Sequence, residues 1–182
     1  MGKNLRICGK SSNFAVDLTS LAGLTGLTSL TGLAIMNTFL GNTDVKLDDK
    51  GRIFIPANYR KILAQMESKR IIVRHDTDNE CLIFYPEPTW NNKVAALRDA
   101  LDEWNPDDQL ILMQFMAEAE ILEMDGQGRV LLSKKILPTE SNALLFVGML
   151  DRFALWNPKN FEEKKLSQAE LATNIRKRMT GR

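Results

Sequence analysis

The chain has 182 residues and a formal net charge of +1, with 44% hydrophobic and 26% charged residues. This composition is typical of a globular protein and excludes a collagen-like or largely disordered chain. Two cysteines cannot staple a fold of this size, which favours a reducing compartment, and a single histidine excludes any site that needs two imidazoles.

Residues 1–35 differ in composition from the rest of the chain. The segment 18–34 reads LTSLAGLTGLTSLTGLA, and the basic residues Lys3, Arg6 and Lys10 precede it. A positive start before an apolar run suggests a secretory signal, but Thr and Gly recur too often for a good apolar region, and the run is too polar to span a bilayer. We expect a disordered low-complexity leader over 1–35, with Met36 as a candidate true start.

A β-hairpin is the first element expected after the leader. The turn DDKG at residues 48–51 has Asp at its first position, where the carboxylate caps backbone amides, and Gly at its last, where a positive φ causes no strain. Pro56 is expected at the first position of a helix over ANYRKILAQM. The strands expected in this half are 43–47, 52–55, 71–74 and 81–85.

Residues 89–117 are expected to form a helical connector. Thr89 is placed to cap a helix whose apolar residues alternate in steps of four and three, which makes one apolar stripe. Asn105-Pro106 is expected to cap a second helix over 107–119. The stripe consists of Trp90, Val94, Leu97, Leu101 and Trp104. We expect it to pack against the β-structure or a neighbouring subunit, so that Trp104→Ala loosens the fold or the oligomer more than it alters the turns.

The second half of the chain repeats the first. Residues 124–133 read MDGQGRVLLS where 47–56 read LDDKGRIFIP, and FALWNP at 153–158 matches CLIFYP at 81–86. Two copies of one supersecondary unit explain both matches. The strands expected here are 121–124, 129–132, 143–148 and 152–156.

The helix signals of the second half differ from those of the first. Ser133 is a candidate N-cap for a helix that Pro138 keeps short. Asn157-Pro158 is expected to start another helix, and Ser167 with Glu170 forms a capping box for a last one, which ends in the basic tail IRKRMTGR.

Charge alternates along the chain. Residues 50–74 carry seven basic and one acidic residue, 75–125 carry two basic and thirteen acidic, and 126–182 carry eleven basic and five acidic. The two basic blocks begin at the two Gly-Arg turns, which favours an anionic partner. A solvated helix face is an equally good explanation of the acidic connector.

The paired Asp-x-x-Gly-Arg hairpins, together with the FYP and WNP landmarks, resemble the MraZ family. The stretch NTFLGNTDVKLDDKGRIFIPANYRK is similar to the N-terminus of that family, and the resemblance covers residues 37 to about 165. It implies an α+β, mainly β fold made of two tandem swapped-hairpin β-barrel halves of the SpoVT-AbrB type. These halves would pack as a pseudo-dimer, with connecting and C-terminal helices. The implied organisation is the leader 1–35, a first domain 40–88, the connector 89–117, a second domain 118–161 and the tail 162–182.

The resemblance also implies a function. Members are DNA-binding transcription regulators that form ring-shaped homo-oligomers and act on division and cell-wall genes, including their own promoter, at short G-containing direct repeats. We therefore expect a cytoplasmic, nucleoid-associated repressor, not an enzyme, without cofactor or metal and without a membrane partner. The second unit departs from the family pattern at Gly126-Gln127 and Ser133, which leaves equal contribution of the two turns open.

The residues expected to bind DNA follow from the resemblance and from chemistry. A guanidinium fork matches the two acceptors of guanine in the major groove, whereas lysines neutralise phosphates and carry no sequence information. The alternative is that each arginine only pairs with its local aspartate. The expected DNA-binding residues are Arg52, Arg129, Lys50, Gly51 and Gly128, with Asp48 and Asp125 orienting the loops and Lys61, Lys134 and Lys135 as weaker phosphate contacts.

Other functional interpretations of the sequence have weaker support. His75 with Asp76 and Asp78 suggests a metal site, but loop carboxylates beside one histidine are more often only solvated. Cys81 is expected to be a buried small hydrophobe. The connector carboxylates Asp102, Glu103, Asp107 and Asp108 are expected to cap helices rather than to form an acid/base pair. The alternative functions are an antitoxin-like or scaffold oligomer that binds protein, and an enzyme on a related barrel.

Overall fold

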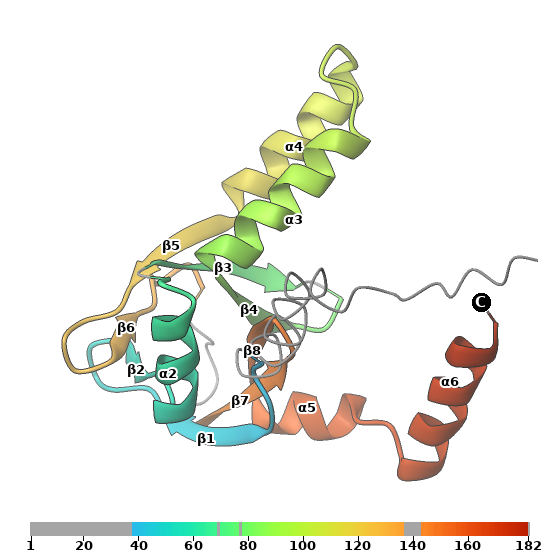
Figure 1. Cartoon of the computed structure of the whole chain (residues 1–182). Helices are drawn as coiled ribbons and strands as arrows, with labels where there is room; N and C mark the ends of the chain where they lie inside the picture. Colours follow the sequence, from blue (N-terminus) through green and yellow to red (C-terminus); the bar gives the residue numbers. More distant parts are fainter. Residues whose placement is uncertain (1–37, 69, 77, 137–142, 182) are drawn as a thin grey trace, which may run out of the picture. The chain divides into compact units, whose positions relative to one another are not determined.

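The computed structural model describes residues 38–68, 70–76, 78–136 and 143–181. The expectations about the leader 1–35, Met36 and Pro138 lie outside these ranges. The strands are β1 (Asn42–Lys46), β2 (Arg52–Phe54), β3 (Arg70–Asp76), β4 (Cys81–Pro86), β5 (Ala119–Glu123), β6 (Arg129–Leu131), β7 (Ala143–Met149) and β8 (Arg152–Trp156). The helices are α2 (Ala57–Gln65), α3 (Glu87–Ala100), α4 (Pro106–Ala117), α5 (Pro158–Lys164) and α6 (Gln168–Thr180) (Figure 1).

The strand order shows that the two halves exchange strands. Six antiparallel strands form one sheet in the order β1-β7-β8-β4-β3-β5, and β2 pairs with β6 in a separate two-stranded ribbon. The first strand of each half therefore pairs with the other half: β1 with β7, and β5 with β3. The central pair is β4 with β8. The order reads the same from both edges once each strand is replaced by its counterpart, as a pseudo-dimer of two swapped units requires.

The predicted α+β, mainly β class with paired swapped halves is confirmed, with one correction. The six-stranded sheet is not closed into a barrel, because among the described strands β1 and β5 each pair on one side only. The ribbon of β2 and β6 lies apart from this sheet as a second layer instead of completing its circle. The expected β-barrel halves are therefore an open sheet with a ribbon over it.

The sheet has a core on each face, because successive side chains of a strand point to opposite faces. On one face, Ile71 and Val73 of β3 and Leu82 and Phe84 of β4 join a cluster that α2 and the ribbon cover. Five aromatic rings lie at its centre, with Phe84 and Phe153 stacked at 5.2 Å between ring centroids. The five rings are Phe39, Tyr59, Phe84, Phe146 and Phe153.

The opposite face is covered by the base of the helical connector. Ile72, Ile83 and Tyr85 pack there with Trp90 of α3, whose ring stacks on Phe115 of α4 at 5.4 Å. Because β4 has a core on both faces, all six of its residues are buried. Cys81 is among them and is 4% exposed, as expected for a small hydrophobe, and burial raises the pKa of its thiol to about 12.

The connector departs from its prediction at both ends. Helix α3 begins at Glu87 rather than at Thr89, whose hydroxyl donates to the carbonyl of Asp151. It ends at Ala100, so Trp104 belongs to the turn between α3 and α4 and is 83% exposed. Within the described residues, the apolar stripe packs against the sheet-face cluster through its first two members, Trp90 and Val94. This exposure does not support the first alternative, that Trp104 stabilises the fold of its own chain, and the second, that it stabilises the oligomer, stays a prediction.

Three of the predicted helix caps form in the structure, and those at Pro56 and Ser133 differ from the prediction. The side chains of Asn105 and Asn157 accept from the amides two residues on, and Ser167 forms a complete capping box with Glu170. Pro56 precedes α2 instead of opening it. After Ser133 the described chain forms only a turn, and the Ser133 hydroxyl donates to Glu120 at 2.9 Å, so it does not cap a helix.

Candidate nucleic-acid interface

The first Asp-x-x-Gly-Arg turn is held by a single carboxylate. Asp48 Oδ1 accepts from the backbone amides of Lys50, at 2.9 Å, and Arg52, at 2.8 Å. The amide of Gly51 donates to the Asp48 carbonyl at 2.9 Å, and Gly51 has a φ of 78°. This is the turn chemistry that the sequence predicted, since aspartate caps amides and glycine adopts a positive φ.

The second turn repeats this geometry with different residues between its ends. Asp125 Oδ1 accepts from the amides of Gln127 and Arg129, each at 2.9 Å. Gly128 has a φ of 84° and donates its amide to the Asp125 carbonyl at 2.9 Å. Replacing Asp-Lys by Gly-Gln inside the turn therefore leaves its backbone unchanged, because the ends define it.

Each arginine is bound by the aspartate of its own turn. Asp48 Oδ2 accepts from both Nε and Nη2 of Arg52 at 2.7 Å, and Asp125 Oδ2 accepts from the same atoms of Arg129 at 2.8 Å. These bonds use the Nε–Nη2 edge of each guanidinium, and within the described residues Nη1 and the second hydrogen of Nη2 have no carboxylate partner. Each aspartate is thus hydrogen-bonded to the arginine of its own turn, which both the orienting role and the simple pairing alternative predict.

Hydrogen bonds from the arginines lower the pKa values of both carboxyls. The Arg52 side chain is the main reason that the pKa of Asp48 falls from its ordinary 3.8 to about 2. For Asp125 the backbone amide of Arg129 is the first cause of the lowered pKa, and the guanidinium is the second. Both turns are therefore fully charged pairs at neutral pH.

The two turns meet on one ribbon. Residues Ile53 and Val130 pair at the centre of the β2–β6 ladder and are fully buried beneath it. The carbonyl of Gly51 accepts from the amide of Leu132 at 2.9 Å, and the carbonyl of Gly128 accepts from the amide of Ile55 at 3.0 Å. Each turn is therefore hydrogen-bonded to the end of the strand that follows the other turn. The position of one turn thus depends on the position of the other.

The outward face of the ribbon carries both arginines. Because side chains alternate along a strand, the neighbours of the buried Ile53 and Val130 point outward. Arg52 pairs with Leu131 and Phe54 pairs with Arg129 across the ladder. Phe54 and Leu131 are 55% and 58% exposed. The face is thus two arginines placed diagonally between two exposed apolar side chains.

Two side chains that sequence reasoning missed distinguish the second turn from the first. The guanidinium of Arg129 lies over the ring of Phe54, 5.7 Å from its centroid. Arg60 of α2 reaches across to the second turn, where its Nη1 donates to the Gln127 carbonyl at 3.5 Å. Phe54 read only as part of an apolar strand and Arg60 only as part of a basic block, because both contacts join residues far apart in the sequence.

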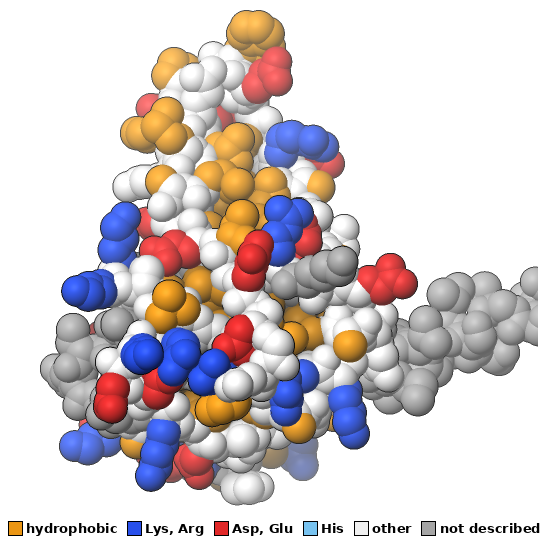
Figure 2. Space-filling view, turned by 90° about the vertical axis from the view of Figure 1, so that its left-hand side faces the viewer, with side chains coloured by type: hydrophobic (Ala, Val, Ile, Leu, Met, Phe, Trp, Pro, Cys, Tyr) orange, Lys and Arg blue, Asp and Glu red, His pale blue; other side chains and the backbone are white. Residues whose placement is uncertain are grey.

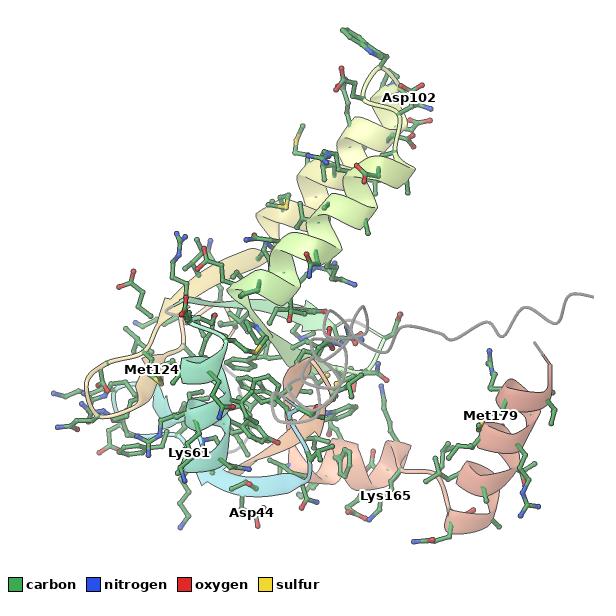
Figure 3. All side chains as sticks on the ribbon, in the orientation of Figure 1. Asp44, Lys61, Asp102, Met124, Lys165 and Met179 are labelled. Atoms are coloured by element: carbon green, nitrogen blue, oxygen red, sulfur yellow. The ribbon has the colours of Figure 1, made fainter. Side chains whose placement is uncertain are left out.

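The expected phosphate-binding lysines are all exposed. Lys50 lies in the first turn, Lys61 on α2, and Lys134 with Lys135 in the turn after β6. Figure 2 shows Lys and Arg side chains gathered on the lower part of the face that it presents, and Figure 3 shows Lys61 on the outside of α2. The ribbon is thus accompanied by basic residues from both halves.

The other candidate sites have local structural explanations. Asp76 accepts from the amides of Asp78 and Asn79 and so caps the β3–β4 turn. In the connector, Asp102 accepts from the Trp104 amide, and Asp108 accepts from the Asp102 amide. Within the described ranges, no group of three His, Cys, Asp or Glu side chains is placed to hold a metal ion. No helix there is long and apolar enough to cross a membrane.

The fold and the site define a class: an α+β protein of two swapped repeats that presents two aspartate-bound arginines on one ribbon. The family model described as "MraZ protein, putative antitoxin-like" matches residues 38–112 and 115–182. The chain therefore belongs to the MraZ family, and the two matches follow the two halves of the pseudo-dimer, with their boundary inside α4.

Relatives of known name agree with this assignment. Transcriptional regulator MraZ of Bacteroides fragilis is 38% identical over 130 residues, which span 70% of this chain and 82% of that protein. The protein of the same name from Bacteroides thetaiotaomicron is 36% identical, over 77% of this chain and 91% of the relative. That from Shewanella halifaxensis is 33% identical, over 74% and 88%.

Proposed function

We propose that this protein is a sequence-specific DNA-binding transcriptional regulator. The observation that carries the proposal is that both aspartate-bound arginines share the outward face of the β2–β6 ribbon. The major groove of DNA admits a two-stranded ribbon, and its base edges present a distinct pattern for each base pair. The matching relatives are named transcriptional regulators. We propose no enzymatic activity for this protein.

The arginines read bases and the aspartates hold them in place. With Nε and Nη2 bound to the carboxylate, the Nη1–Nη2 end of Arg52 or Arg129 can donate two hydrogen bonds to O6 and N7 of guanine. Such a bidentate contact discriminates against a wrong base by about 1–3 kcal/mol. Asp48 and Asp125 do not contact DNA, because phosphates repel them. Their bonds fix the guanidinium plane before DNA arrives, which lowers the ordering cost of binding.

Lysines supply affinity without sequence preference. Lys50, Lys61, Lys134 and Lys135 are exposed and contact phosphates in this proposal. Gly51 and Gly128 are buried, and their part in binding is to adopt the positive φ that shapes each turn. Counterions released from the phosphates make this part of the affinity strongly dependent on salt.

A ribbon with two arginines cannot specify an operator alone. We propose a homo-oligomeric ring that places several ribbons on short direct repeats, because linked weak contacts multiply into a large avidity. The sites are those of the division and cell-wall gene cluster, including the protein's own promoter, and binding represses transcription. This role places the protein in the cytoplasm, on the nucleoid. The ribbon-bearing domains are residues 40–88 and 118–161, and the segments 89–117 and 162–182 are connector and tail.

The test is binding to a fluorescent duplex from the DNA upstream of the gene, compared with a shuffled duplex at two salt concentrations. Wild type is expected to prefer the upstream duplex and to weaken steeply with salt. Arg52→Ala and Arg129→Ala should each remove the preference. Equal binding of both duplexes by wild type would contradict sequence-specific recognition. No binding by a folded oligomer would instead favour an antitoxin-like or scaffold oligomer that binds protein.

A further inference from the structure

The turn between α3 and α4 presents an exposed indole in an acidic setting. Trp104 is 83% exposed. Residues 99–108 carry five acidic and no basic residues. A large exposed aromatic side chain at the end of a helical hairpin has no role in the core of its own chain. Trp, however, is among the residues that dominate binding energy at protein interfaces.

This tip is held in a defined conformation. The Asp102 carboxylate accepts from the Trp104 amide at 3.0 Å, and Asp108 accepts from the Asp102 amide at 2.9 Å. Asn105 caps α4 by accepting from the Asp107 amide at 2.9 Å. Figure 3 shows Asp102 at the end of the hairpin. A side chain presented on a pre-ordered turn loses less entropy on binding than one on a flexible loop.

A groove of complementary character lies where α5 meets α6. Its volume is about 410 Å³, within the range of about 300–1,000 Å³ typical of pockets that hold a small molecule, so one indole fits. Two lysines and no acidic residue line it. The lining that matters here is Trp156, Phe161, Leu166 and Leu171 as the apolar part, with Lys164 and Lys165 as the basic part.

The charges of the two helical segments are opposite. Residues 87–118, which contain α3 and α4, carry seven acidic and two basic residues. Residues 158–181, which contain α5 and α6, carry six basic and three acidic. Apolar side chains remain exposed on both: Leu110 and Met113 of α4 are 56% and 65% exposed, and Ile175 of α6 is 48% exposed. Figure 2 shows hydrophobic side chains along the hairpin.

The two segments belong to opposite halves of the sheet. Helix α3 packs on β3 and β4, and α5 packs on β7. In the strand order, β8 and β4 separate β7 from β3. Since Trp104 and the apolar residues of α4 and α6 are exposed, the hairpin tip does not fill the groove of its own chain. A second copy has the same pair of surfaces, and its tip has the size and charge that the groove accepts.

We propose that the α3–α4 tip of one copy docks in the α5–α6 groove of the next, with Trp104 inserted between Trp156, Phe161 and Leu171. The contact joins two different surfaces, so it is heterologous and leaves one tip and one groove open on every dimer. Further copies add until the chain of contacts closes, as ring assembly requires. This inference rests on the homo-oligomer of the proposed function and assigns its interface.

The test is sedimentation of the full chain without DNA, with one variant for each surface. Trp104→Ala removes the inserted side chain, and Leu171→Asp places a charge in the groove. Each is expected to weaken self-association at least about 30-fold, as loss of an interface hot spot does. Thr173→Asp is the matched control, because it adds the same charge on the opposite side of α6 from Leu171 and should leave the assembly intact. Melting curves establish that all three variants fold.

Mixing the two defective variants gives the decisive result. Trp104→Ala retains a groove and Leu171→Asp retains a tip, so an equimolar mixture is expected to form dimers that neither forms alone, and no larger assembly. Absence of dimers in the mixture, unchanged assembly of either variant, or a monomeric wild type would overturn the proposal. Because no DNA is present, these outcomes are independent of whether the Arg52 and Arg129 variants lose sequence preference.

Discussion

The two halves of this chain have the same strands and the same turns but different surroundings. Aspartate, glycine and arginine take equivalent positions in both turns, down to the hydrogen bonds of the carboxylates. The first half adds α2 and the α3–α4 connector, and the second adds α5 and α6. The duplicated framework therefore sets the backbone of the site, whereas side chains that differ between the two halves make the two turns unequal.

The two turns differ because, in the part of the chain that the structure describes, the second has two side-chain contacts that the first lacks. Arg129 rests on Phe54, and the second turn is contacted by Arg60 of α2, so both of its extra contacts come from the first half. The position in the first turn that corresponds to Arg129 is Arg52, which pairs across the ladder with Leu131. An exposed leucine offers no ring face to a guanidinium. We therefore expect the second arginine to be the more firmly held of the two.

The largest expected effect separates the base of the connector from its tip. Trp90→Ala removes a buried ring that stacks on Phe115 and should lower the free energy of unfolding by about 3–5 kcal/mol. Trp104→Ala, at the exposed tip, should change it by less than about 0.5 kcal/mol. Urea unfolding at a protein concentration that keeps each variant monomeric measures both. A comparable loss for the two variants would mean that the tip is packed within its own chain.

A smaller effect is expected where the halves meet at β7. A Cβ on Gly148 would lie 2.5 Å from the carbonyl carbon and oxygen of Phe39, so Gly148→Ala must push two backbone segments apart. We expect a loss of about 1–3 kcal/mol, as in other overpacked sites. Gly126→Ala is the control, because nothing lies within 4 Å of its added Cβ. Equal melting temperatures for the two variants would show that the Phe39 segment yields without cost.

Removing the aromatic ring of Phe54, over which Arg129 lies, should have a modest effect on DNA binding. An exposed cation–π contact contributes about 0.5–1 kcal/mol, so Phe54→Ala should weaken binding of the upstream duplex about two- to fivefold. Leu131→Ala, which alters the corresponding position opposite Arg52, should change it less. Fluorescence anisotropy titrations compare the two variants. A larger effect of Leu131→Ala would reverse the ranking of the two arginines.

The smallest expected effect is a difference in titration. The lowered pKa of Asp48 means that its charged pair stabilises the turn above about pH 4 and is lost as the pH falls through about 2. Arg52→Ala should raise this pKa from about 2 toward the ordinary 3.8. Arg129→Ala should raise the pKa of Asp125 less, because the backbone amide is the first cause there. Carboxyl carbon NMR titrations resolve both, and a larger rise at Asp125 would contradict the order of causes.

The turns and most helix caps are predictable from the sequence because they depend on local chemistry. The turns at Asp48 and Asp125, the caps at Asn105 and Asn157 and the capping box at Ser167 each depend on residues within four positions of one another. The repeat likewise predicted two equivalent units. Short-range patterns sufficed wherever one side chain satisfies neighbouring backbone groups.

Features that depend on distant pairs were not predictable in the same way. The open sheet, the ribbon that joins Ile53 to Val130, and the reach of Arg60 to Gln127 all depend on which strands meet. The spacing of the apolar stripe predicts a helix that continues to Trp104, but the chain leaves the helix at Leu101, where Asp102 and Asp108 form the turn. Periodicity alone does not show where capping side chains end a helix.

The central claim is that the guanidinium groups of Arg52 and Arg129 read bases and do not merely supply charge. Replacing both by lysine keeps the charge and removes the planar fork. The measurement is the ratio of affinities of this double variant for the upstream and shuffled duplexes, with its salt dependence. We predict that the preference is lost while salt-dependent binding to both duplexes persists. A double lysine variant that still prefers the upstream duplex as wild type does would contradict the account.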